Sequence, residues 1–273
     1  MTISLFTIRH FAISFPMDLL AALAPEGVTP LAALLVVAAS FFTAALTAAF
    51  GLGGGLALLA VMGALFPPAA VVPVHGAAQL GANLSRFALQ RRDVVWPIVL
   101  WFALGGVLGA ALGGRIYVAL PDEALRAAVG LFILLTVWGP KPKTFEPGAR
   151  TFFLTGAVGA FLTMFFGATG PIAATMLSAT RLDRLKTVAT HAACMVAQHG
   201  LKTLAFGAIG FAFGEWALLI AAILTAGFLG SWAGVRFLRA MPEARFRTGF
   251  RLMLTFFGFY LLGAAGLSVF RTG

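Results

Sequence analysis

The feature that most constrains this chain is the absence of any Asp, Glu, Lys or Arg between Glu26 and Arg86. A helix needs roughly 20 apolar residues to cross a bilayer core of ~30 Å, and this run is far longer. The composition agrees, because 60% of the residues are hydrophobic and 10% are charged, whereas soluble domains carry roughly 25% charged residues. The apolar runs are continuous rather than alternating, which favours helices over β-barrel strands. We therefore expect an all-α, polytopic (multi-pass) membrane protein.

Further charge-free runs occur along the rest of the chain. They are Val94–Gly114, Ala127–Pro140, Thr151–Thr180, Trp216–Val235 and Leu252–Phe270. Several of them are long enough to span the membrane as a helix.

The two halves of the chain repeat each other. His75-Gly-Ala-Ala resembles His191-Ala-Ala-Cys at an offset of 191 − 75 = 116, and the same offset pairs Gly54 with Gly170 and Arg86 with Lys202. Each half is predicted to open with a broken, glycine-rich helical hairpin and to continue with three transmembrane helices. The predicted boundaries are a lead-in segment at 1–29, a first repeat at 30–140, a cytoplasmic linker at 141–150 and a second repeat at 151–273. In the first repeat the hairpin pieces are expected at 31–50 and 54–66, and the three helices at about 70–91, 94–117 and 122–140.

The distribution of basic residues favours inverted repeats. If each half makes an odd number of crossings, most Lys and Arg residues fall on one side of the membrane, as the positive-inside rule requires for the cytoplasmic side. Both termini then lie on the non-cytoplasmic side of a cell inner (plasma) membrane. The residues on the basic side are Arg91, Arg92, Lys141, Lys143, Arg150, Arg181, Arg184, Lys186, Arg236, Arg239, Arg245 and Arg247; the other side receives chiefly Arg9, Arg115, Arg126 and Arg271.

The glycine runs Gly51-Leu-Gly-Gly-Gly55 and Gly167-Ala-Thr-Gly-Pro171 interrupt apolar stretches at equivalent places. A broken helix inside a membrane survives only within protein or beside a water-filled cavity. The helix that restarts after each break points its N–H groups at that cavity, and such an N-terminus favours anions. Small residues also serve close helix packing, but recurrence in both halves favours a substrate site. The candidate residues are Gly53, Gly54, Gly55, Thr169 and Gly170.

Each break is followed by a helix with a polar stripe. His75, Gln79, Asn83 and Arg86 fall within roughly 80° of one another at 100° per residue, and His191, Gln198, His199 and Lys202 form the corresponding stripe. Polar groups at membrane depth are costly and often mark a transport pathway. The alternatives are hydrogen bonds between helices and, for Arg86 and Lys202, side chains that extend to the membrane interface. The stripes complete the predicted substrate-binding set.

Two other patterns indicate structure rather than transport. Gly105, Gly109 and Gly113 form a GxxxGxxxG row, weakly echoed by Ala226, Gly230 and Gly234, which is typical of helix packing. The Trp residues, including Trp96, Trp101, Trp138 and Trp216, lie mostly near the ends of predicted spans, as interface anchors do.

No catalytic constellation is found in the sequence. It contains no HExxH, GxSxG or Walker motif and no paired carboxylates, so neither an enzyme nor a cofactor or metal requirement is expected. Although the net charge is +10, the basic residues cluster in short loops, which argues against a nucleic-acid partner. The charges at membrane depth are positive or belong to His, which favours an anionic substrate.

The glycine-rich segments resemble those of the TauE/SafE family of sulfite and organosulfonate exporters. The resemblance rests on Ala49-Phe-Gly-Leu-Gly-Gly-Gly55, on Phe165-Phe-Gly-Ala-Thr-Gly-Pro171 and on the small-residue helices after each, and extends from about residue 30 to 266. It implies export, or alternatively uptake, of a small sulfur-containing anion such as sulfite, sulfoacetate or a related sulfonate, with carboxylates as a further option. Without an ATP site, transport is expected to be secondary and driven by an ion gradient. His75, His191 and His199 suggest proton coupling as a hypothesis.

A second class remains open from the sequence. His75, His191, His199, Cys194 and Met195 are ligand types that suit soft or borderline divalent ions, so the alternative is a permease for a transition-metal ion. The partners compatible with the sequence are the lipid bilayer, a small anionic substrate and further copies of the same chain.

Overall fold

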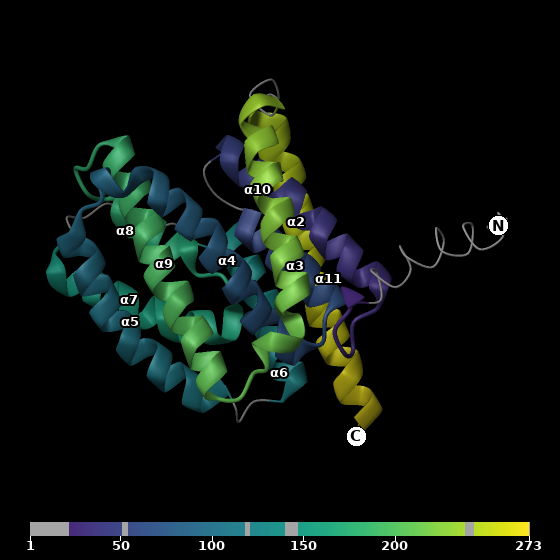
Figure 1. The fold of residues 1–273 in the computed structure, drawn as a ribbon. Helices are drawn as coiled ribbons and strands as arrows, with labels where there is room; N and C mark the ends of the chain where they lie inside the picture. Colours follow the sequence, from purple (N-terminus) through teal and green to yellow (C-terminus); the bar gives the residue numbers. More distant parts are fainter. Residues whose placement is uncertain (1–21, 51–53, 118–120, 140–146, 238–242, 273) are drawn as a thin grey trace, which may run out of the picture.

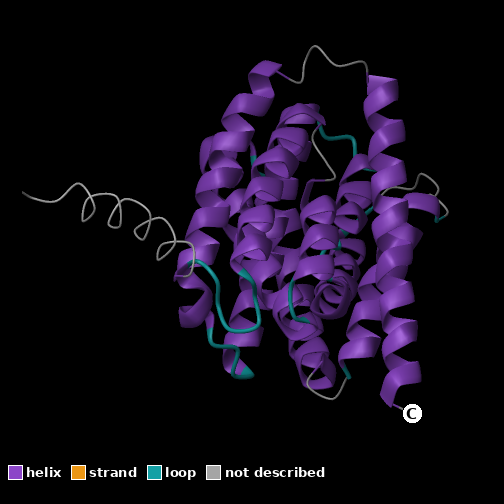
Figure 2. Cartoon of the chain, turned by 90° about the vertical axis from the view of Figure 1, so that its right-hand side faces the viewer, coloured by secondary structure: helices purple, strands orange, loops and turns teal. Residues whose placement is uncertain are grey.

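The computed structural model of the chain describes residues 22–50, 54–117, 121–139, 147–237 and 243–272, and these contain helices and loops but no strand (Figures 1 and 2). This confirms the all-helical prediction. The α-helices in chain order are α2 (Pro30–Phe50), α3 (Gly54–Leu65), α4 (Pro68–Gln90), α5 (Trp96–Tyr117), α6 (Asp122–Trp138), α7 (Ala149–Phe166), α8 (Gly170–Ser178), α9 (Arg184–Ala208), α10 (Ala217–Phe237) and α11 (Glu243–Thr272); the 3-10 helices are η1 (Arg91–Asp93) and η2 (Phe213–Trp216).

The predicted helix break in the second half is present, and residues 51–53 of the first predicted break lie outside the described ranges. Helix α2 ends at Phe50 and α3 begins at Gly54, while α7 ends at Phe166 and α8 begins at Gly170. In the second break Gly167 has a φ of +78°, a conformation that only glycine adopts readily. Pro171 then occupies the first turn of α8, where its missing N–H costs nothing. Five helices therefore follow one another in the same order in each half.

The helices pack in pairs that cross between the two halves. Helix α5 packs along α7, and α10 packs along α2, while α4 contacts α9 and α6 contacts α11 (Figure 1). Helices α5 and α10 also touch α9 and α4, respectively. The order across the molecule is therefore α7, α5, α9, α4, α10 and α2, with the two polar-stripe helices in the middle.

The glycine rows bring these paired helices into backbone contact. A Cβ atom at Gly105 or Gly109 of α5 would overlap the carbonyl oxygen of Phe153 or Ala157 on α7. A Cβ atom at Gly230 of α10 would overlap the Phe41 carbonyl oxygen on α2 in the same way. The predicted packing role of these glycines is confirmed.

Among the described residues, four helical segments are long and apolar enough to cross a membrane: Pro30–Thr47, Trp96–Tyr117, Ala149–Phe166 and Phe213–Ala233. They lie in α2, α5, α7 and η2–α10, which form the α5–α7 and α2–α10 pairs. The outward faces of α5 carry exposed large apolar side chains such as Leu104 and Leu108, as a lipid-facing helix does. The membrane assignment is supported by these segments.

One tryptophan departs from expectation. Trp96 and Trp101 are exposed, but Trp216 is only 6% exposed and lies 5.5 Å from the Phe66 ring, measured between centroids. Trp216 was predicted as an interface anchor, and that prediction is wrong because η2 folds its indole inward against the core.

Several predictions fall on residues outside the described ranges. The lead-in segment at 1–29 is described only from residue 22, and the linker at 141–150 only from residue 147. Gly53 also lies outside the described residues. The domain boundaries and a homo-oligomeric state stay predictions.

Candidate functional site

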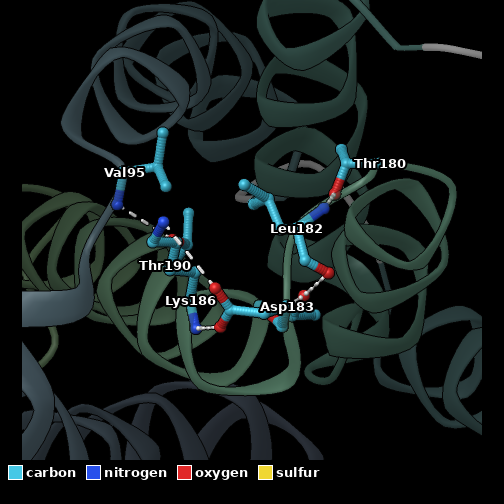
Figure 3. Close-up of polar contacts among 7 residues, drawn as sticks. Val95, Thr180, Leu182, Asp183, Lys186 and Thr190 are labelled. Atoms are coloured by element: carbon cyan, nitrogen blue, oxygen red, sulfur yellow. Dashed lines mark hydrogen bonds and ion pairs between the residues drawn. The ribbon is translucent and has the colours of Figure 1, made fainter.

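The site is built on α4 and α9. Hydrogen bonds hold the N-terminal end of α9 in place (Figure 3). The Asp183 carboxylate accepts a hydrogen bond from the Lys186 backbone N–H at 2.9 Å and caps the helix. That backbone hydrogen bond lowers the pKa of the exposed Asp183 carboxyl below its usual value. One turn further on, the Thr190 hydroxyl accepts from the Val95 backbone N–H at 3.0 Å. The start of α9 is thereby tied to the loop that follows α4.

The opposite ends of α4 and α9 meet at a buried lysine. The Lys202 side chain is fully buried, and a Cβ atom at Gly76 of α4 would lie 2.6 Å from its Cε atom. Because the end of α4 lies near Thr190 and its start lies near Lys202, the two helices run antiparallel. The Lys202 side chain is therefore enclosed by the protein and does not reach its surface.

The partner of Lys202 is the break between α7 and α8. Its Nζ atom donates a hydrogen bond to the Gly167 carbonyl oxygen at 2.8 Å, and the Thr163 hydroxyl donates to the same oxygen at 3.1 Å. The positive φ of Gly167 turns this carbonyl out of the α7 hydrogen-bond ladder and towards α9. The broken backbone thus supplies the contact that holds the ammonium group.

A histidine of each stripe is hydrogen-bonded to the helix that restarts after the break. His75 Nε2 lies 2.8 Å from the Gly55 carbonyl oxygen, and His191 Nε2 lies 3.2 Å from the Gly170 carbonyl oxygen. A carbonyl oxygen only accepts, so each Nε2 atom carries a proton and donates. The two histidines therefore anchor the first residues of α3 and α8 to α4 and α9.

A chain of hydrogen bonds links α7, α8 and α9. Gln198 Nε2 donates to Thr169 Oγ1 at 2.8 Å, and Thr169 Oγ1 donates to the Gly159 carbonyl oxygen at 2.9 Å. All of the Thr169 side chain and nearly all of the Gln198 side chain are buried. The predicted residues Thr169 and Gln198 are thus brought together next to the second break.

His199 joins the two stripes. Its ring centroid lies 6.2 Å from that of His75, with the rings close to perpendicular. Three polar atoms in this region are buried and lack a hydrogen-bond partner: His75 Nδ1, His199 Nδ1 and Gln198 Oε1. We call His75, Gln198, His199 and Lys202 the central cluster. Buried polar groups are nearly always hydrogen-bonded, so unpartnered atoms here indicate a place for a ligand or ordered water.

Other predicted residues lie outside the central cluster. The Asn83 amide donates to the Gln79 carbonyl oxygen of its own helix at 2.7 Å, and Asn83 Oδ1 accepts from Arg86 at 2.8 Å. Gln79 borders Gly55, where a Cβ atom would lie 2.9 Å from its Nε2. Arg86 is half-buried. These residues form a polar segment that continues along α4 towards its end.

Gly54 lies in close contact with α2. A Cβ atom at Gly54 would overlap the Thr43 carbonyl oxygen of α2. Gly54 thus allows α3 to pack against α2, as Gly109 allows α5 to pack against α7. At Gly170, in contrast, a Cβ atom would meet only Met195 Sδ at 3.5 Å and His191 Nε2 at 3.9 Å.

Three glycines beside the central cluster are absent from the predicted substrate-binding set, although Gly167 belongs to the predicted second break. Gly76 makes room for the Lys202 side chain, the Gly167 carbonyl receives its ammonium group, and Gly159 lies beside Gln198. Gly76 stands next to His75 in the repeated motif, so its position was a visible signal. Gly159 lies among many small residues of α7, where nothing in the sequence distinguishes it.

The alternative of a metal-ion permease finds no support. Within the described part of the chain, no group of three or more His, Cys, Asp or Glu side chains could hold a metal ion. Cys194 is buried in an apolar cluster that includes Val99, Phe102 and Ala173.

Comparison with protein families gives one match. The family model described as sulfite exporter TauE/SafE matches residues 36–261, which is most of the chain. Comparisons with curated proteins and with solved structures give no match.

Proposed function

Because this chain belongs to the sulfite exporter TauE/SafE family of membrane transporters, we propose that it is a secondary transporter of a small sulfur-containing anion such as sulfite, sulfoacetate or a related sulfonate. The proposal includes export across the cell inner membrane and no enzymatic activity. The observation that carries it is the Lys202 ammonium group, which is buried and hydrogen-bonded to a carbonyl oxygen rather than to a carboxylate.

A buried cation without a counter-ion is unfavourable by several kcal/mol. None of the nine Asp and Glu residues of the sequence falls within α3, α4, α7, α8 or α9. A carbonyl oxygen offers Lys202 a dipole but not a negative charge. An anion that enters the site supplies the missing charge, so the free energy of Lys202 burial favours anion binding.

The backbone around the breaks supports the same location. Helices α3 and α8 begin at glycines, and a helix N-terminus carries a partial positive charge. We place the anion near mid-membrane between Gly51–Gly55 and Gly167–Pro171, within reach of His75 and Lys202. Such sites between broken helices of two repeats are common in secondary transporters.

The test is anion binding to purified protein with a substitution at Lys202. Lys202→Gln should weaken sulfite and sulfonate binding roughly ten- to hundredfold, because a charge-assisted hydrogen bond contributes about 1.5–3 kcal/mol. The matched control is Lys186→Gln, which removes a half-exposed lysine from the start of the same helix. Equal binding by both variants, or no anion binding by the wild-type protein, would contradict the proposal.

The inverted arrangement of the repeats belongs to this proposal. The asymmetry of basic residues supports a cytoplasmic linker at 141–150 and non-cytoplasmic termini. Reporter fusions at Gly273 and within the linker test it. A cytoplasmic C-terminus would overturn the inverted repeat without bearing on anion binding.

We further propose that an ion gradient drives transport, with protons as the coupling ion. His75, His191 and His199 lie along the proposed path, and imidazole is the side chain that titrates nearest physiological pH. In sealed vesicles containing the purified protein, an imposed pH gradient should drive sulfonate movement. Transport that ignores the pH gradient but follows a sodium gradient would replace protons with sodium.

A further inference from the structure

The central cluster combines one buried cation with acceptor atoms that have no partner. Resting on the anion-transport function proposed above, we infer that the substrate is a monoanion that carries its own hydrogen-bond donor. A sulfonate with a hydroxyl or ammonium group fits this description, and so does an inorganic oxyanion that retains one proton.

The charge of the cluster favours a monoanion. The hydrogen bonds among the described residues bring one ammonium group, that of Lys202, into the cluster. Arg86, its counterpart in the first half, is half-buried and already hydrogen-bonded to Asn83. One negative charge neutralises Lys202, whereas a second would have only the Arg86 guanidinium as a counter-ion, and that group is already hydrogen-bonded to Asn83.

The first unpartnered acceptor is on His75. Its Nε2 atom donates to the Gly55 carbonyl oxygen, so in the neutral imidazole the proton is on Nε2 and Nδ1 keeps its lone pair. Nδ1 is buried and has no hydrogen-bond partner. The neighbouring His199 Nδ1 is also buried without a hydrogen-bond partner. A ligand that approaches Lys202 with a hydroxyl or ammonium group can donate to this side of the cluster.

The second acceptor is on Gln198. Its Nε2 atom donates to Thr169, whose hydroxyl proton is already given to the Gly159 carbonyl oxygen. The direction of this chain fixes the amide orientation and leaves Oε1 as an acceptor. Oε1 is buried without a partner, and a Cβ atom at Gly159 would lie 3.0 Å from it. Glycine at position 159 therefore leaves room for the Gln198 amide oxygen.

An anion without a donor leaves these acceptors unsatisfied. The free-energy cost of leaving a buried polar group unpaired exceeds the net free energy gained from its hydrogen bond. A site that hydrogen-bonds a ligand hydroxyl therefore rejects analogues that lack the hydroxyl. The site should therefore select its ligand by two separate features: a negative charge, which binds Lys202, and a hydrogen-bond donor, which binds the unpartnered acceptors.

The experiment compares ligands that differ in one feature. Hydroxyethanesulfonate and propanesulfonate have the same charge and nearly the same shape, with a hydroxyl replaced by a methyl group, while sulfoacetate is a dianion of similar size. We expect the purified wild-type protein to bind hydroxyethanesulfonate about tenfold or more tightly than either of the others. A second comparison tests an inorganic ligand with the same chemistry. In mildly acidic buffer, the affinity for hydrogensulfite, which carries a proton to donate, is compared with that for methanesulfonate, which carries none.

Variants locate the preference. Gln198→Met should bring the ratio of hydroxyethanesulfonate to propanesulfonate affinity close to one. The matched control is Gln90→Met at the end of α4, because Gln90 Oε1 is also buried without a partner but lies outside the central cluster; this variant should keep the wild-type ratio. If Gln198→Met does not fold, the ratio of the two sulfonate affinities in the wild-type protein tests the donor requirement by itself.

The outcomes separate this inference from the proposed function. Equal binding of hydroxyethanesulfonate and propanesulfonate, or tighter binding of sulfoacetate, would overturn the donor requirement while leaving anion transport intact. Binding of none of these anions would overturn both. A preference for hydrogensulfite alone would assign the donor to a protonated inorganic oxyanion, and a preference for hydroxyethanesulfonate alone to an organic sulfonate.

Discussion

In the first half of the chain, His75 donates a hydrogen bond to the Gly55 carbonyl oxygen, and in the second half His191 donates to that of Gly170. The bond is shorter in the first half, at 2.8 Å against 3.2 Å. Both halves thus use one device to attach a restarted helix to the polar helix that follows it. The two halves therefore share this hydrogen bond at equivalent positions.

The cations of the two halves differ more than the scaffold does. Arg86 is half-buried and bonded to Asn83 of its own helix, whereas Lys202 is fully buried and bonded across helices to Gly167. The equivalent positions therefore carry the same charge in different surroundings. In the proposed anion site, the second half supplies Lys202, Gln198 and His199, and the first half supplies His75.

The largest difference between the halves is expected at the glycines that start α3 and α8. Gly54→Val should abolish folded protein, because even a Cβ atom would overlap the α2 backbone. Gly170→Val should fold and weaken sulfonate binding, because its Cβ meets only side chains at ordinary contact distance. Yield of monodisperse protein in detergent measures the first effect, and binding measures the second. Gly109→Val should behave like Gly54→Val, and a well-folded Gly54→Val protein would contradict this distinction.

Substitution of the two cations should give the next largest effect. Lys202→Gln should weaken anion binding roughly ten- to hundredfold, as a lost charge-assisted hydrogen bond predicts. Arg86→Gln should weaken it less, because the Arg86 guanidinium is already hydrogen-bonded to Asn83 of its own helix. Isothermal titration of the two proteins with one sulfonate measures both. Equal losses would show that the anion contacts both halves alike.

The histidine anchors should give a smaller effect, on stability. His75→Phe should lower the free energy of unfolding by about 1–3 kcal/mol, because the buried Gly55 carbonyl loses its donor. His191→Phe should have less effect, because the His191 bond is longer and the side chain is only partly buried. Thermal unfolding in detergent measures the difference. A larger loss of stability in His191→Phe than in His75→Phe would show that the His191 hydrogen bond contributes more, contrary to this prediction.

The smallest effect is expected at the starts of the polar helices. Helix α4 begins at Pro68 without a side-chain cap, whereas α9 is capped by Asp183, so only α9 has a cap to lose. Asp183→Ala should lower Tm slightly at neutral pH. Because the folded pKa of Asp183 is lowered, its contribution is complete above the unfolded value of about 3.9 and is lost as the pH falls through the folded value. Asp183→Asn, which keeps an acceptor oxygen, should retain the cap, and a Tm difference that grows with acidification would contradict this assignment.

The helix breaks and polar stripes were predictable from the sequence because glycine, proline and polar residues at membrane depth have few roles. The start of α8 at Gly170 followed by Pro171 is an example, since both residues have strong positional preferences in helices. The identity of the stripe residues was likewise visible from a spacing of three and four residues.

The partners of the stripe residues were not predictable. Whether Lys202 extends to an interface or stays buried depends on the direction of the Gly167 carbonyl, which follows from a φ of +78° that the sequence does not specify. The role of Gly54 depends on how closely α2 approaches α3. The burial of Trp216 depends on η2, a turn too short to leave a periodic pattern. Each of these is decided by tertiary packing rather than by local preference.

The crossed pairing of helices limits how such a molecule can move. Helix α5 is seated on α7 through glycines that touch backbone, and α10 is seated on α2 in the same way, so each close contact fastens one repeat to the other. Moving one half of the chain as a whole would separate these backbone contacts. Each of the two pairs, α5 with α7 and α2 with α10, contains one helix from each half. The α4–α9 contact lies between the two pairs, and the Lys202 side chain is enclosed there.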